Sequence, residues 1–135
     1  MRLILASLVA IAALFAAGGH RAAQDSKPAL PDPLKLPGYK AFARHCAPCH
    51  GERGDGKGVA ARFLEPPPRD FKREPFRLVS TENNAPSPKD LFETIATGVG
   101  GTAMVPFAGL GDDALWPIVE VVQAFRLQGV RMRLE

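Results

Sequence analysis

The stretch Cys46-Ala47-Pro48-Cys49-His50 decides how the rest of this 135-residue chain is interpreted. It contains both cysteines of the chain, and with only two residues between them they cannot join distant segments. On one turn of helix, the two thiols and the imidazole that follows can all reach one flat ligand. Cys-x-x-Cys-His is the attachment pattern for c-type haem. We therefore assign Cys46 and Cys49 to covalent attachment of one haem c, and His50 to its iron.

Three other interpretations of the cysteine pair remain as alternatives. A thioredoxin-like redox pair follows a strand and opens a helix, whereas this pair follows a predicted helix and precedes a stretch with glycine at four of eight positions, 51–58. A zinc site needs further Cys or His ligands, and only His20 and His45 remain. The pair could also be structural and buried.

A second axial ligand is expected from Met104, which lies in a glycine-rich stretch at positions 98–111. Of the other methionines, Met1 is the initiator and Met132 lies between two arginines in the charged tail. Ligation by Met and His suits electron transfer. The alternatives are that Met104 fills core space, or that His45 is the ligand. His45 directly precedes Cys46, so we expect it on the same side as His50.

The apolar spacing predicts an all-α domain of three to four helices with long loops around the haem. We expect helices over residues 38–46 and 87–98, a short helical turn over 59–64, and a last helix from Asp112 or Asp113 to about Gln128. Ser87, Pro88 and Asp90 form a good helix start. Pro117 requires the last helix to begin late. The irregular stretch 65–87 is long enough to be functional.

The first residues are typical of an export signal. Arg2 precedes the fifteen-residue apolar run Leu3–Ala17, and small residues follow. That order predicts a signal peptide over residues 1–23. The run is short for a membrane span, so an uncleaved anchor is the alternative. We expect a periplasmic protein, bound to the membrane only if this segment remains attached.

Residues 24–37 carry four prolines and are predicted to be an extended tether before a domain at 38–130. Loss of residues 1–23 removes two cations and no acid, which leaves 15 Lys and Arg against 14 Asp and Glu. The basic pI of the full chain therefore overstates the charge of the domain. Nothing in the charge pattern indicates nucleic-acid binding.

Together these residues resemble those of class I c-type cytochromes over about positions 38–128. The matching pieces are Cys46–Gly51, Gly54–Gly58, Pro67–Phe71, Gly101–Met104 and Leu115-Trp116. The resemblance implies a small cytochrome c fold, thioether bonds at Cys46 and Cys49, and His50 and Met104 as axial ligands. It also implies a close crossing of the first and last helices, with contacts from Gly38 and Phe42.

The chain departs from the family pattern at two positions. Val59 stands where the family has a proline whose carbonyl accepts a hydrogen bond from the ligating histidine, and we expect the carbonyl of residue 59 to keep that role. Val105 separates Met104 from Pro106, whereas the family's proline follows its methionine directly.

The resemblance implies a carrier of single electrons between exported redox partners, and not an enzyme, because both axial positions are filled. Two alternatives remain. The domain could be the haem subunit of a larger oxidoreductase complex, or a gas-binding or sensing haem protein in which Met104 does not bind the iron.

Overall fold

The computed structural model describes residues 28–135, which form four α-helices joined by 3-10 turns and long loops. The helices are α1 (Tyr39–His45), α2 (Ala47–His50), α3 (Pro88–Thr97) and α4 (Asp112–Leu134). Between them lie η1 (Pro33–Lys35), η2 (Ala61–Phe63) and η3 (Ala108–Leu110). The described residues contain no strand, only an isolated bridge between Asp55 and Asp70. The all-α prediction is confirmed.

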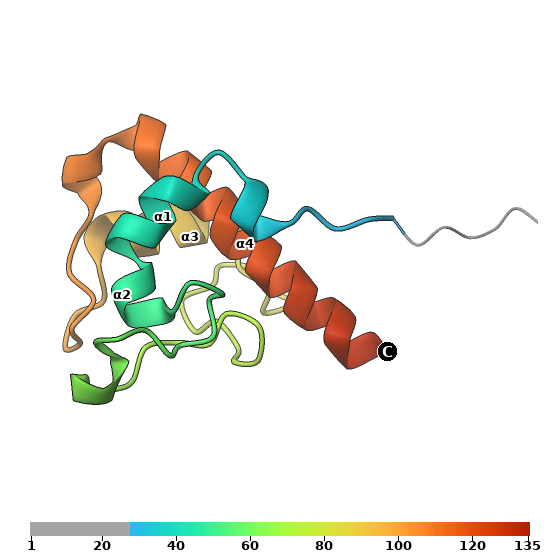
Figure 1. Cartoon of the computed structure of the whole chain (residues 1–135), viewed down its shortest axis with the longest axis horizontal. Coiled ribbons are helices and arrows are strands. Elements are labelled where there is room, and N and C mark those ends of the chain that lie inside the picture. The colour runs from blue at the N-terminus through green and yellow to red at the C-terminus, as the bar shows by residue number, and fades with distance from the viewer. Residues whose placement is uncertain (1–27) are drawn as a thin grey trace, which may run out of the picture.

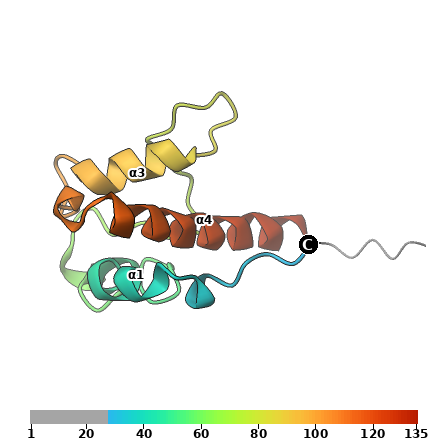
Figure 2. The same cartoon turned by 90° about the horizontal axis from the view of Figure 1, so that it is seen from above.

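Helix α4 is the axis of the fold, with α1 on one side and α3 on the other (Figures 1 and 2). Its residues Leu115, Ile118, Val119, Val121, Val122 and Phe125 are almost completely buried. Helix α2 continues the chain from α1, and Cys46 is the residue between them. The cysteine motif therefore directly follows α1, the helix that packs on α4.

The crossing of α1 and α4 is close because Gly38 has no side chain. A β-carbon at Gly38 would lie 2.1 Å from the carbonyl oxygen of Pro117, which is closer than two such atoms can approach. One turn further along α1, Phe42 is fully buried, with its ring 5.4 Å from that of Phe125. The crossing predicted from the family resemblance is therefore present.

Helix α3 begins where the sequence predicted. The Ser87 hydroxyl accepts a hydrogen bond from the Asp90 amide at 3.1 Å, and the Asp90 carboxylate accepts one from the Ser87 amide at 2.8 Å. This reciprocal capping box satisfies two amides that a helix start leaves free. Leu91 and Ile95 form the buried face. Phe92 instead stacks on Trp116 of α4, with ring centres 4.5 Å apart.

Helix α4 is longer than predicted. It begins at Asp112, contains Pro117, and continues six residues past Gln128 to Leu134. Pro117 lies in the second turn of α4, where it lacks the amide hydrogen that would bond to the carbonyl of Asp113. The extension is held from outside the helix, since the Arg133 guanidinium donates to the Lys72 carbonyl at 2.6 Å. The spacing of apolar residues in the sequence could not predict this extension, because the contact comes from a distant part of the chain.

The proline-rich segment differs from the extended tether expected at 24–37. Residues 33–35 form η1, and Pro33 is fully buried and η1 packs on α4. The Asp32 carboxylate caps this turn by accepting from the Leu34 amide at 3.1 Å. The signal-peptide prediction for residues 1–23 lies outside the described residues. Among those that are described, no helix is both long and apolar enough to cross a membrane.

Candidate haem site

A cavity of about 480 Å³ opens between α1–α2, α3, α4 and the loop 65–87. Cys46, Cys49 and His50 line it from the α1–α2 side, and Met104 lines it from the loop between α3 and α4. The structure thus brings together all four residues that the sequence singled out. The remaining lining is mostly apolar, including Phe42, Leu91, Ile95, Ile118 and Val122.

The imidazole of His50 is fixed by a hydrogen bond to a backbone carbonyl near the start of the loop 65–87. Its Nδ1 lies 3.1 Å from the carbonyl oxygen of Arg69, and the ring stacks on Phe71 with centres 4.5 Å apart. Burial lowers the pKa of His50, an effect that the hydrogen bond to the Arg69 carbonyl opposes. The neutral ring donates through Nδ1 and leaves the lone pair of Nε2 for a metal.

The carbonyl that holds His50 is a correction to the sequence analysis. We expected residue 59 to supply it, but Val59 is 82% exposed and the acceptor is Arg69. The Pro67–Phe71 stretch carried a signal that could have indicated this, because it belongs to the family resemblance. Its role was missed because nineteen residues separate Arg69 from His50.

The two cysteines are unpaired and half-buried, and no disulfide joins them. Burial, with a smaller contribution from the nearby Cys49, raises the pKa of the Cys46 thiol to about 12. That thiol therefore stays protonated at neutral pH when nothing is bound to it. No cluster of three metal-binding side chains exists among residues 28–135, which argues against the zinc alternative. The absence of any strand over the same residues argues against a thioredoxin-like pair.

The backbone around Met104 is held by a small hydrogen-bond network. The Met104 amide donates to the Thr102 hydroxyl at 3.1 Å, and that hydroxyl donates to the Val99 carbonyl at 2.7 Å. The Met104 carbonyl accepts from the Val99 amide at 3.0 Å. Gly98 has a positive φ of 71°, and a β-carbon there would lie 2.5 Å from the Met104 carbonyl oxygen. The end of α3 therefore supports the methionine loop.

His45 also lines the cavity. Its ring makes an edge contact with Phe107, at 6.5 Å between centres. Phe107 follows Met104 on the same loop. His45 is therefore the residue against which any assignment of Met104 as a ligand must be tested.

The loop 65–87 forms one wall of the cavity, as its length suggested. Phe71 and Phe76 stack 6.0 Å apart on its inner side. Arg69 and Glu74 form an ion pair on this wall, with 3.5 Å between the guanidinium nitrogen and the carboxylate oxygen. Arg77 also lines the cavity.

The arrangement fits a covalently bound haem. The cavity volume lies in the range of organic cofactor sites, its walls are mostly apolar, and both thiols border it together with the imidazoles of His50 and His45 and the thioether of Met104. Haem bound there supplies an iron that changes between ferric and ferrous states. The fold and this donor set define a c-type cytochrome of class I.

Residues 34–120 match the family described as cytochrome c oxidase, cbb3-type, subunit III. The match covers more than half of the chain, and the protein belongs to this family of cytochrome c domains. No curated protein matches the chain in sequence.

The chain is also similar to a solved structure, the reducing HAO-like protein complex of Kuenenia stuttgartiensis. The two chains are 30% identical, with a TM-score of 0.58 over 73% of this chain. This chain spans 45% of that chain. The likeness supports the cytochrome c fold over most of the described domain.

Proposed function

We propose that this protein is a monohaem cytochrome c that carries single electrons between exported redox partners. Membership of a cytochrome c family implies haem-based electron transfer. The observation that carries the finer proposal is that one cavity is bordered by Cys46, Cys49, His50 and Met104. One attachment motif in the sequence corresponds to one haem.

His50 and Met104 are the proposed axial ligands. Arg69 orients the imidazole of His50 through Nδ1, which increases the basicity of Nε2. The thioether of Met104 and the apolar walls favour the ferrous state, and so raise the reduction potential. With both axial positions filled by the chain itself, no substrate reaches the iron.

The rim of the cavity is suited to brief contacts with a partner. Leu78 and Val105 line the cavity and are also 55% and 58% exposed. Transient redox complexes bury little surface, so a small apolar rim is enough for electron transfer at the edge of the cavity.

The test is spectroscopic. The mature protein should gain the mass of one haem, show a six-coordinate low-spin spectrum in both oxidation states, and bind carbon monoxide slowly and weakly after reduction. Rapid, tight binding of carbon monoxide would instead establish the gas-binding alternative. A colourless exported protein with two thiols that alkylate freely would refute haem attachment itself.

A second candidate is the haem subunit of a larger oxidoreductase complex. It is favoured by the similar chain in Kuenenia stuttgartiensis, which belongs to a protein complex. Affinity purification from the native membrane and soluble fractions distinguishes the two roles. A catalytic chain recovered in equal amount with the cytochrome supports the subunit role, and a cytochrome recovered alone supports the free carrier.

Export to the periplasm is part of the proposal. Arg2, the apolar run Leu3–Ala17 and the small residues after it support a signal peptide or a retained anchor. The mass of the mature chain decides between them, because cleavage removes about the first 23 residues.

A further inference from the structure

We infer that one end of the molecule binds the surface of an anionic phospholipid membrane. This surface, here called the basic end, consists of Lys72, Arg73, Arg131 and Arg133, together with Met132 and Leu134. The inference rests on the proposed export, since an exported chain is delivered at a membrane.

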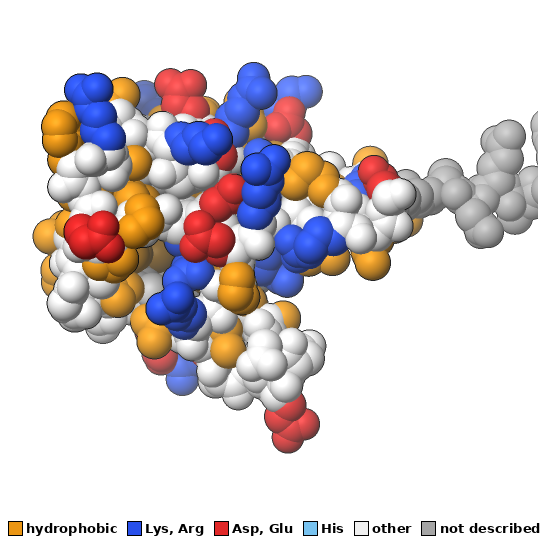
Figure 3. All heavy atoms as spheres, turned by 90° about the horizontal axis from the view of Figure 1, so that it is seen from below, with side chains coloured by type: hydrophobic (Ala, Val, Ile, Leu, Met, Phe, Trp, Pro, Cys, Tyr) orange, Lys and Arg blue, Asp and Glu red, His pale blue; other side chains and the backbone are white. Residues whose placement is uncertain are grey.

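The charge of the basic end is of one sign along α4. Between residues 121 and 134 the helix carries three arginines and no acid. Arg133 donates to the Lys72 carbonyl at 2.6 Å, which joins the helix to the second pair of cations at 72–73. Figure 3 shows Lys and Arg side chains along the surface that leads to the start of the described chain.

The acids near these cations are engaged in other contacts. Asp70 accepts from the amides of Lys72 and Arg73 at 2.8 and 3.1 Å. Glu74 pairs with Arg69 at 3.5 Å. Glu135 follows the helix and adds one negative charge. With Glu74 paired to Arg69, the four cations of the basic end outnumber Asp70 and Glu135 by two, and anionic lipid headgroups attract this excess of positive charge.

Two apolar side chains accompany the arginines. Met132 is 54% exposed and Leu134 is 79% exposed, both on the last turn of α4. Membrane-surface helices combine cations with apolar residues that enter the boundary between headgroups and acyl chains. Protein interfaces also bury Met and Arg side chains, so the choice of a lipid surface rests on the position of the N-terminal segment.

The position of the N-terminal segment provides the independent argument. The Arg131 guanidinium donates to the Pro28 carbonyl, so the first described residue lies beside the end of α4 (Figure 1). Ten residues, 18–27, separate Pro28 from the apolar run Leu3–Ala17. Ten residues span at most about 35 Å. When that run lies in or crosses a membrane, the basic end is the part of the domain held nearest to it.

The last turn of α4 lies away from the part of the cavity that α4 lines, whereas Lys72 and Arg73 lie between two lining residues, Phe71 and Glu74. Val122 is the last residue of α4 to line it, and Arg133 lies eleven residues further along the helix, about 16 Å along the axis. The exposed rim at Leu78 and Val105 belongs to the cavity end of the molecule. A redox partner can therefore reach the rim while the last turn of α4 contacts lipid.

The experiment uses the exported holoprotein, as processed, with vesicles of phosphatidylglycerol and phosphatidylcholine in equal parts, or of phosphatidylcholine alone. We expect hydrogen exchange over residues 126–134 to slow with the anionic vesicles only. For a cleaved chain, sedimentation also gives the affinity. The double variant Arg73→Gln and Arg133→Gln should have an affinity for anionic vesicles that is weaker by about twenty-five-fold, because each lost charge weakens binding by about fivefold.

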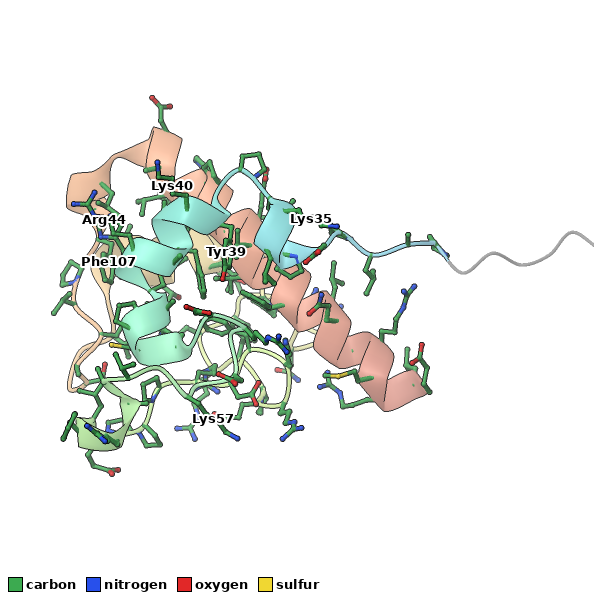
Figure 4. All side chains as sticks on the ribbon, viewed as in Figure 1. Lys35, Tyr39, Lys40, Arg44, Lys57 and Phe107 are labelled. Carbon is green, nitrogen blue, oxygen red and sulfur yellow. The ribbon has the colours of Figure 1, made fainter. Side chains whose placement is uncertain are left out.

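The matched control is Lys40→Gln with Arg44→Gln, which removes two exposed cations from α1 (Figure 4). Figure 4 places both away from the C-terminal end of α4, so affinity should stay close to that of the unchanged protein. Because Arg133 also holds Lys72, the pair Met132→Ser and Leu134→Ser provides a second test that leaves this hydrogen bond in place. It too should weaken binding.

The inference is overturned if hydrogen exchange over residues 126–134 slows equally with phosphatidylcholine vesicles, or if it slows with neither vesicle. It is also overturned if the α1 control loses as much vesicle affinity as the variant of the basic end. Protection by soluble polyglutamate, as strong as that by vesicles, would assign the basic end to an acidic protein. If the N-terminal segment is retained, it should hold every variant on every vesicle, and affinity no longer separates the variants. Hydrogen exchange over residues 126–134 still reports whether the basic end contacts the lipid. A coloured, six-coordinate protein that ignores vesicles refutes only this inference, whereas a chain recovered unprocessed from the cytoplasm refutes export.

Discussion

The two sides of the cavity are built in different ways. On the His50 side, the thiols and the imidazole lie within one five-residue stretch that directly follows α1, the helix that packs on the buried axis α4. On the Met104 side, a single candidate ligand lies in a loop held by Thr102, Val99 and the glycine that ends α3. Attachment therefore depends on short-range covalent geometry, and completion of the coordination depends on a tertiary contact. Removing residues from each side should separate the two functions.

The largest effect is expected on the attachment side. Cys46→Ala with Cys49→Ala removes both thioether bonds, so no haem should remain with the chain on a denaturing gel. Met104→Ala should leave the covalent haem staining unchanged. Staining that survives loss of both cysteines would contradict the attachment assignment.

On the other side, Met104→Ala should lower the reduction potential and remove the far-red absorption band that reports contact between sulfur and ferric iron. The physical reason is the loss of the thioether that favours ferrous iron. His45→Ala is the matched control, because His45 lines the same cavity and contacts Phe107. A band that persists without Met104, or disappears without His45, would refute the assignment.

The helix crossing that supports both sides should be sensitive to one methyl group. Gly38→Ala places a β-carbon 2.1 Å from the Pro117 carbonyl oxygen, so the helices must move apart. We expect a loss of about 1–3 kcal/mol in the free energy of unfolding of the holoprotein, which is typical of overpacking. Gly109→Ala is the control, because nothing lies within 4 Å of a β-carbon there. Equal stability of the two variants would show that the crossing is not tight.

A smaller effect is expected at the start of α3, which supports the methionine loop from a distance. Ser87→Ala removes an N-cap and should cost about 1 kcal/mol in the free energy of unfolding. Hydrogen bonds from the Ser80 side chain, and then from the amides of Ser87 and Ser80, lower the pKa of Asp90. The stability that ionised Asp90 contributes is therefore complete above the ordinary carboxyl pKa and is lost as the pH falls toward the lowered value.

Denaturant unfolding of the holoprotein, followed from above pH 4 into acid, measures this dependence. Asp90→Asn should make stability fall less steeply over that range than in the unchanged protein. A variant with the same slope would mean that Asp90 titrates alike in the folded and unfolded chain.

The attachment side was predictable from the sequence because its chemistry is local. The spacing of Cys46, Cys49 and His50 fixes their relation whatever surrounds them, and the Ser87 cap likewise requires only its own turn. The partner of His50 was not predictable, because residue 69 becomes its neighbour only when the loop folds back. The six extra residues of α4 depend on contacts with Lys72 and Pro28 from elsewhere in the chain. The domain boundaries at 23 and 37, and the role of Met104 as ligand, stay predictions.

Gly98 has a consequence for the speed of electron exchange. Because the peptide after Met104 rests directly on the backbone of Gly98, the position of the proposed sulfur ligand is set by the end of a helix. Hydrogen bonds at 3.0 and 3.1 Å hold the same residue from both of its backbone groups. If Met104 binds the iron, a backbone held in this way would limit how far the ligand shifts when the charge on the metal changes. The rearrangement that accompanies oxidation or reduction would then be small, which would lower the barrier to moving an electron in either direction.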